Sequence, residues 1–111
     1  MDESETAKEI YRLHAGLCKT LADPTRLEIL NLLKDEEKSV GELVTLTGVR
    51  QATMSQHLAV LRQRGVVLTR KDGATIYYSI KNPKIIEAYE IIKAVLFEQI
   101  NEMKKLVVNM N

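Results

Sequence analysis

The change of periodicity at Gly65 constrains this chain more than any other feature. Residues 48 to 65 read GVRQATMSQHLAVLRQRG, and within them Met54, Leu58 and Leu61 fall at i, i+4 and i+7, which is one face of a helix. Directly afterwards come two runs rich in β-forming residues, VVLTRK and ATIYYSI, separated by Asp-Gly. Asp-Gly between such runs is a strong hairpin signal. The sequence therefore predicts a helix ending at Gly65 and followed at once by a β-hairpin.

Four further segments have helical patterns: residues 4 to about 20, 24 to 33, 40 to about 46, and 83 to about 108. Ser4 and Ser39 are the expected N-caps of the first and third. Pro24 interrupts the first and suits the start of the second. Gly48 is expected to end the third in a left-handed conformation. The predicted order is α-α-α-α-β-β-α, a mainly α chain with a β-hairpin. No linker divides residues 1–111, so a single domain is expected.

Length and composition exclude several classes of protein. The chain has 111 residues, of which 45% are hydrophobic and 28% charged, as in ordinary globular domains. Its apolar runs are too short to cross a bilayer, and the acidic start MDESETAKEI is unlike a secretory signal peptide. One cysteine forms no intrachain disulfide, which fits a reducing compartment. We therefore expect a cytoplasmic protein without a membrane segment.

The charges are distributed unevenly along the chain. From Leu43 to Lys71 there is no Asp or Glu, whereas four arginines and Lys71 supply five positive charges. Because the whole chain carries +1, the remainder carries −4. A solvated helix face usually carries acids among its bases, so a basic stretch on a near-neutral protein favours a surface for a polyanion such as nucleic acid.

Two short helices joined by Thr-Gly-Val, the second with a polar outer face, predict a helix-turn-helix. The second helix of that motif lies in the DNA major groove, where amides and hydroxyls can bond to base edges. The residues expected to contact bases are Gln51, Thr53, Ser55 and Gln56. Those expected to contact the DNA backbone are Arg50, His57, Arg62, Arg64, Arg70 and Lys71. The hairpin then serves as a wing with Arg70 and Lys71 near its tip.

Three segments together resemble the ArsR family of dimeric winged-helix repressors. They are LADPTRLEILNLL, GELVTLTGVRQATMSQHLAVLRQRGVV and RKDGATIYYSI, and the resemblance covers nearly the whole chain. It implies a homodimer, joined through the first and last helices, on an inverted-repeat operator. The last helix is also too long and too apolar for a small monomer to cover. The expected interface residues are Ile10, Leu17, Ile92, Leu96, Ile100 and Met103.

Many members of this family sense a metal, but the residues that do so are missing here. The positions of a Cys-x-Cys pair at the start of the third helix hold Ser39 and Gly41. The positions of a second site, on the last helix, hold Asn82, Lys84, Val95 and Glu98, and of these only Glu98 is a ligand type. No metal or cofactor is therefore expected, because a zinc-like site needs three or four converging donors.

Cys18 and His14, four residues apart on the first helix, leave one effector site open. With their symmetry mates they could form a metal or redox sensor; the simpler interpretation is that Cys18 is a small buried side chain. A second alternative is a winged-helix module for protein contacts without operator binding. The sequence shows no nucleophile–base pair and no glycine-rich phosphate loop, so no enzyme is expected. The prediction is a sequence-specific DNA-binding regulator, a repressor, with an unidentified effector.

Overall fold

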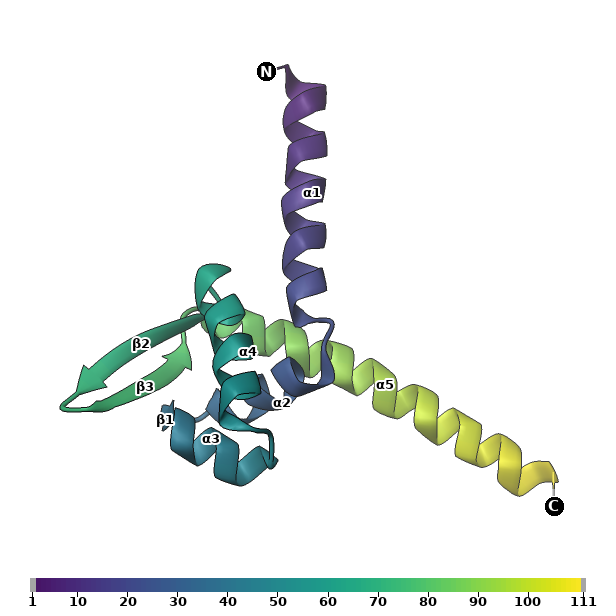
Figure 1. Ribbon diagram of the computed structural model, residues 1–111. Coiled ribbons are helices and arrows are strands. Elements are labelled where there is room, and N and C mark those ends of the chain that lie inside the picture. Colours follow the sequence, from purple (N-terminus) through teal and green to yellow (C-terminus); the bar gives the residue numbers. More distant parts are fainter. Residues whose placement is uncertain (1, 111) are drawn as a thin grey trace. The chain divides into compact units, whose positions relative to one another are not determined.

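The computed structural model describes residues 2–110 (Figure 1). Contacts along the chain divide it into two compact units, the first ending at Lys81 and the second beginning at Asn82. Each unit is described by itself below. The organisation of residues 1–111 as one domain remains a prediction.

Two helices open the first unit, and a side-chain cap starts each of them. α1 (Glu3–Leu21) is capped by Asp2, whose carboxylate accepts from the Glu5 amide at 2.8 Å. The predicted cap at Ser4 is therefore wrong: an aspartate two residues earlier accepts this bond and lets the helix begin sooner. α2 (Pro24–Leu33) begins with proline at its first position, as predicted. Asp23 Oδ1 accepts from the Arg26 amide at 3.1 Å and caps this helix.

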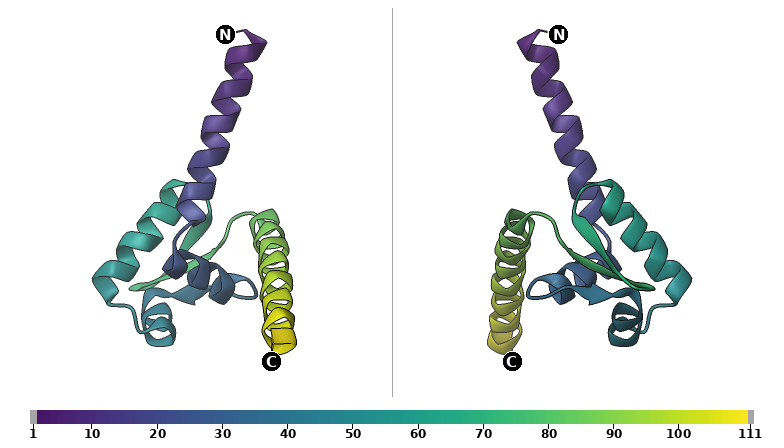
Figure 2. Two further views of the ribbon diagram at one scale, coloured as in Figure 1. Left: turned by 90° about the vertical axis from the view of Figure 1, so that its right-hand side faces the viewer. Right: turned by 90° about the vertical axis from the view of Figure 1, so that its left-hand side faces the viewer.

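The next two helices form the predicted helix-turn-helix. α3 (Val40–Thr47) starts with a capping box, in which Ser39 and Glu42 each accept from the other's backbone amide. It ends at Gly48, whose φ of 74° lies in the left-handed region, where glycine is favoured. α4 (Gln51–Gln63) follows after a short turn. Figure 2 shows α3 and α4 meeting at that turn at a steep angle.

A three-stranded antiparallel sheet completes the first unit. Its order is β1 (Lys38–Ser39), β3 (Thr75–Ile80) and β2 (Val67–Asp72). β2 and β3 form the predicted hairpin, but Asp72 pairs with Thr75, so the two turn residues are Gly73 and Ala74 instead of the predicted Asp-Gly. Gly73 has a φ of 61°, which suits the first turn position of a hairpin. β1 was not predicted, because two residues are too few to show periodicity.

The core of the first unit joins the helices to the sheet. It contains side chains from α2, α3 and α4, from the start of β2 and from the residue before β2, all 2% exposed or less: Ile29, Leu30, Leu33, Leu43, Met54, Leu58, Leu61, Val66 and Val67. Burial of an aliphatic side chain stabilises by roughly 1.5–3 kcal/mol. Because three of these residues lie on α4, that helix is held firmly by one face.

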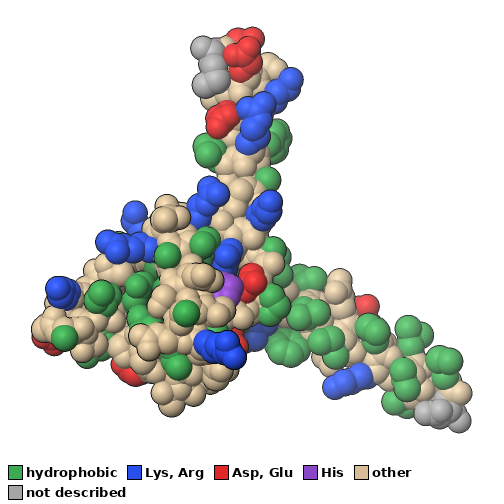
Figure 3. Space-filling model, viewed as in Figure 1, with side chains coloured by type: hydrophobic (Ala, Val, Ile, Leu, Met, Phe, Trp, Pro, Cys, Tyr) green, Lys and Arg blue, Asp and Glu red, His purple; other side chains and the backbone are tan. Residues whose placement is uncertain are grey.

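The second unit consists of one long helix, α5 (Pro83–Met110). None of the residues of α5 is buried. On the face in view, Figure 3 shows hydrophobic side chains along this helix with few charges between them. Within residues 2–110, no helix combines the length and apolar character needed to cross a membrane.

Candidate nucleic-acid interface

α4 separates an apolar inner face from a polar outer face. Met54, Leu58 and Leu61 are each 0% exposed, as their spacing predicted. On the outer side, the four residues expected to contact bases are all exposed: Gln51, Thr53, Ser55 and Gln56. They occupy the first half of the helix. Because the opposite face is packed, these side chains are held on a fixed backbone, as a surface that reads bases requires.

The N-terminal end of α4 can accept a negatively charged group. Its first turn has no acidic residue, and the side chain of Arg50 makes no capping hydrogen bond. The amides of a helix's first turn have no partners within the helix and carry a partial positive charge. Arg50 is exposed beside them. This end of the helix therefore suits a phosphate.

Arg62 and Arg64 lie at the other end of the polar face, and both are exposed. At 1.5 Å per residue, Arg62 is about 16 Å along the axis from Gln51. The guanidinium of Arg64 lies close to Gly16 of α1. The two arginines are thus too far from the first turn of α4 to share its phosphate, and would reach a different part of a DNA backbone.

The hairpin brings an acidic partner to one of its basic residues. Arg70 of β2 donates to both carboxylate oxygens of Glu37, from Nε at 3.1 Å and also from Nη2. Its guanidinium carbon lies 4.7 Å from the centre of the Tyr77 ring on β3. The Arg70 bond holds the pKa of Glu37 below its ordinary value, and Glu37 in turn raises that of Arg70. Sequence reasoning missed this pair, because Glu37 lies outside the acid-free stretch.

Lys71, the other basic residue predicted on the hairpin, is not part of the Arg70–Glu37 pair. Lys71 is exposed and pairs with Ile76 across the hairpin. Figure 3 shows Lys and Arg side chains over the hairpin and over the C-terminal end of α4. Basic side chains thus lie at two places on the face in view, and their joint contact with a polyanion stays a prediction.

His57 lies differently from the other predicted contacts. Its side chain is 17% exposed, and its Nδ1 accepts a hydrogen bond from Arg26 Nε at 3.1 Å. Arg26 Nη1 also donates to the Thr20 carbonyl at 3.0 Å. Asp23 Oδ1 is 4.0 Å from His57 Nδ1. One edge of the imidazole thus faces α2 and the end of α1, and Arg26 belongs to this site although its position in the sequence did not indicate it.

Comparison with known proteins identifies the family. Residues 23–69 match the family described as "Bacterial regulatory protein, arsR family". The chain is 43% identical over 91 residues to the HTH-type transcriptional regulator Rv0081 of Mycobacterium tuberculosis, covering 81% of this chain and 80% of that protein. The chain belongs to the arsR family of bacterial regulatory proteins. The prediction of a transcription regulator is thereby confirmed.

Two other relatives of this arsR-family chain carry more specific names. The transcriptional activator HlyU of Vibrio cholerae is 40% identical over 90 residues, with 81% of this chain and 79% of HlyU covered. The biofilm growth-associated repressor of Xylella fastidiosa is 36% identical over 98 residues, with 88% and 82% covered. Its relatives thus include proteins named for either direction of regulation.

Solved structures confirm the winged helix-turn-helix fold of this arsR-family chain. The crystal structure of Rv0081 has a TM-score of 0.78 at 41% identity and covers 84% of this chain and 94% of that one. A second similar structure is that of the homodimeric winged helix-turn-helix DNA-binding domain Mb0332 of Mycobacterium bovis, solved by NMR. It has a TM-score of 0.79 at 28% identity, with 92% and 93% covered.

The positions of effector sites in this arsR-family chain hold few ligands. Ser39 caps α3, and Gly41 is exposed with no side chain to offer. Within residues 2–110, no three His, Cys, Asp or Glu side chains lie close enough together to share a metal ion. Cys18 is exposed, so the expectation that it is buried is wrong for the single chain: the first unit leaves this face of α1 uncovered. His14, one turn before it, is exposed as well.

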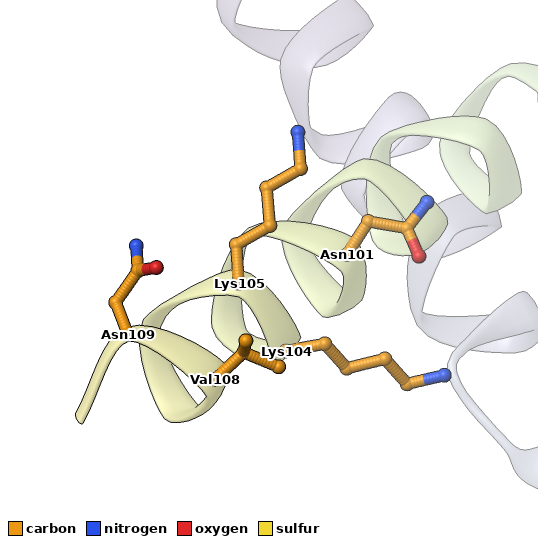
Figure 4. Close-up of a pocket in the computed structure, with 5 residues that line it drawn as sticks. All are labelled: Asn101, Lys104, Lys105, Val108 and Asn109. Atoms are coloured by element: carbon orange, nitrogen blue, oxygen red, sulfur yellow. The ribbon is translucent and has the colours of Figure 1, made fainter. Parts of the chain in front are cut away.

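α5 of the arsR-family chain carries a shallow hollow near its C-terminal end (Figure 4). It is lined by Asn101, Lys104, Lys105, Val108 and Asn109. All five come from one helix, and Figure 4 shows their side chains spreading away from one another. A small-molecule site needs walls on several sides. This hollow offers one wall and lacks the enclosure of a small-molecule site.

Proposed function

We propose that this chain is a homodimeric repressor that binds an inverted-repeat DNA operator, with α4 of each protomer in the major groove. One observation carries the proposal: α4 buries Met54, Leu58 and Leu61 completely and presents its uncharged polar residues outward. Amides and hydroxyls on a rigid helix can distinguish base pairs by their donors and acceptors. An ordinary solvated helix face carries acids among its bases, whereas residues 43–71 contain no acid.

Base recognition and backbone contact are assigned to different residues. Gln51, Thr53, Ser55 and Gln56 would contact base edges. Around them, the residues for phosphates are Arg50, His57, Arg62, Arg64, Arg70 and Lys71. Phosphate contacts supply affinity and orientation, whereas base contacts supply sequence preference. Arg70 would reach DNA only by sharing or leaving Glu37, so we assign more of the wing's contact to Lys71.

Dimerisation is supported by the apolar side chains on the terminal helices. Ile92, Leu96 and Met103 of α5 are exposed, and so is Ile10 of α1. Ile100 and Leu17 are partly exposed. A monomer rarely leaves an apolar surface of this extent in water, and the similar domain Mb0332 is homodimeric. A two-fold axis would present two α4 helices to two half-sites.

Repression follows from occupancy alone. A dimer bound across an operator excludes other proteins from that DNA, and this requires no catalytic group. We infer that the chain acts by binding, without enzymatic activity or cofactor, in the cytoplasm where bacterial DNA lies. The name of the Xylella relative agrees with a repressor, and that of HlyU marks activation as the alternative. A reporter gene placed behind the operator distinguishes them, because deletion of a repressor raises its expression.

Selection of duplexes from a random library tests the proposal. We expect one inverted repeat, with half-site centres one DNA turn, about 34–36 Å, or a multiple of it apart. Repeating the selection with Gln51→Ala should relax the preference at particular bases and leave the repeat spacing unchanged. If no duplex binds tightly at low salt, the proposal fails and a winged-helix module for protein contacts is the better interpretation.

A further inference from the structure

Arg26 ties the recognition helix to the junction between α1 and α2. Its Nε donates to His57 Nδ1 on α4 at 3.1 Å, and its Nη1 donates to the Thr20 carbonyl at 3.0 Å. Thr20 lies in the last turn of α1 and is 4% exposed. Carbonyls in the last turn of a helix have no partners within the helix. One guanidinium thus caps α1 and contacts α4, which lies 31 residues further along the chain.

The bond from Arg26 also selects one tautomer of the neutral His57 ring. An arginine Nε always carries hydrogen and can only donate. His57 Nδ1 must therefore accept with its lone pair, so the proton of the neutral ring is on Nε2. Protonation of Nδ1 would set two donors against each other. Asp23, 4.0 Å away, is the acidic group that faces the same edge of the ring.

The location of His57 gives this protonation state a use. With 3.6 residues per turn, His57 lies between the buried stripe of α4 and its outer face, one turn after Thr53. At 17% exposure, the ring is mostly covered and its orientation is fixed. A neutral ring with hydrogen on Nε2 retains one donor, and phosphate oxygens accept such bonds from the flank of a recognition helix.

We infer that Arg26 is a positioning residue for DNA binding: it holds His57 as the Nε2–H tautomer and fixes α4 against the end of α1, without contacting DNA. This inference rests on the proposed function, because the ordered ring matters only if α4 meets DNA. It adds a residue outside the helix-turn-helix to the recognition machinery. It also connects the terminal helix α1, where the dimer would form, to the helix that reads bases.

Nitrogen-15 NMR of the protein without DNA tests the first half. In the wild type we expect His57 to show an unprotonated Nδ1 and a protonated Nε2 at neutral pH. Arg26→Met keeps much of the aliphatic stem but removes the donor, so the two tautomers should interchange. Arg12→Met, which removes another arginine with a short-range partner, Glu9 at 2.9 Å, is the matched control and should preserve the wild-type signal. An unchanged His57 signal in Arg26→Met would overturn the inference.

Salt-dependent binding to the selected duplex tests the second half. A positioning role predicts that Arg26→Met weakens binding about tenfold at every salt concentration, with the slope of log K against log salt unchanged. Loss of a phosphate contact reduces the slope by about one. A reduced slope in Arg26→Met would therefore contradict the inference and make Arg26 a DNA contact.

A double-mutant cycle separates positioning from general destabilisation. If Arg26 acts through His57, Arg26→Met should have little further effect in a His57→Leu background. His57→Gln, which keeps an acceptor for Arg26 and a donor, should lose less affinity than His57→Leu. Additive losses would overturn the inference. If the wild type binds no duplex, the proposed function fails, whereas the NMR result still decides whether Arg26 holds His57.

Discussion

Arg70 on β2 and Glu37, which immediately precedes β1, form a two-point ion pair between segments 33 residues apart. The Arg70 guanidinium also lies over the Tyr77 ring. The wing is thus joined, through Arg70, to the segment that leads into α3. A wing held in this way keeps a defined orientation relative to α4, and both would meet the same DNA.

This pair predicts a specific pH dependence. The hydrogen bond from Arg70 lowers the pKa of Glu37. A carboxyl whose pKa is lowered in the folded state stabilises that state at pH values above the pKa of unfolded glutamate, about 4.3. This stabilisation is lost as the pH falls through the lower pKa of the folded state. NMR titration of the Glu37 carboxyl should show the lowered pKa in the wild type and a value nearer the ordinary one in Arg70→Met. Arg64→Met should not change it. Equal titration in wild type and Arg70→Met would refute the pairing in solution.

Removal of either glutamine side chain in the first half of α4 should change the DNA sequence preference. Gln51→Ala and Gln56→Ala should each cost ~1–3 kcal/mol of operator binding, because an amide that bonds to a base edge loses its partner. The loss should be confined to particular operator positions, measured with a set of single-base variants. Gln63→Ala, on the same helix but in its last turn, is the matched control. A loss shared equally by every variant duplex would contradict base contact.

Arg64 should behave in the opposite way. Arg64→Ala is expected to weaken binding to all duplexes alike and to reduce the salt slope by about one, because phosphate neutralisation releases counterions whatever the sequence. Titrations of operator and unrelated duplex at several salt concentrations provide the comparison. A loss confined to the operator would mean that Arg64 reads bases.

A charge within the apolar face of α5 should separate the dimer. Leu96 is 52% exposed in the single chain, and Leu96→Glu would bury an unpaired carboxylate if this face is an interface. Analytical ultracentrifugation should then show monomers. Operator affinity should fall, because one dimer would no longer bind both half-sites at once. Glu98→Gln, also on α5, is the control. An intact Leu96→Glu dimer would show that this residue lies outside the interface.

Cys18 tests the remaining question of an effector. The operator affinity of Cys18→Ser should equal that of the wild type, because the thiol lies on α1 and is not assigned to the DNA surface. We also expect the wild type to keep its operator when zinc or a mild oxidant is added. Release by either agent in the wild type, and its absence in Cys18→Ser, would instead establish a sensor at Cys18 and His14.

Much of α4 could be predicted because its pattern is local. The spacing of Met54, Leu58 and Leu61 alone identifies the buried face of α4, and burial of all three confirmed it. Gly48 marked the end of α3 for a similarly local reason, since its φ of 74° is unfavourable for other residues. The exposure of Gln56, on the opposite side of the helix, follows from the same geometry. These features depend on residues a few positions apart.

Long-range pairing explains what the pattern left open. The sequence pattern indicated no partner for Arg26 or Arg70, yet folding places one beside His57 and the other beside Glu37, partners more than thirty residues away. The two residues of β1 form a strand because β3 lies next to them. The amino-acid pattern thus specified which faces of the helices are apolar and which are polar, since that depends on backbone periodicity. The partners of the charged side chains depended on which segments the packed core brought together.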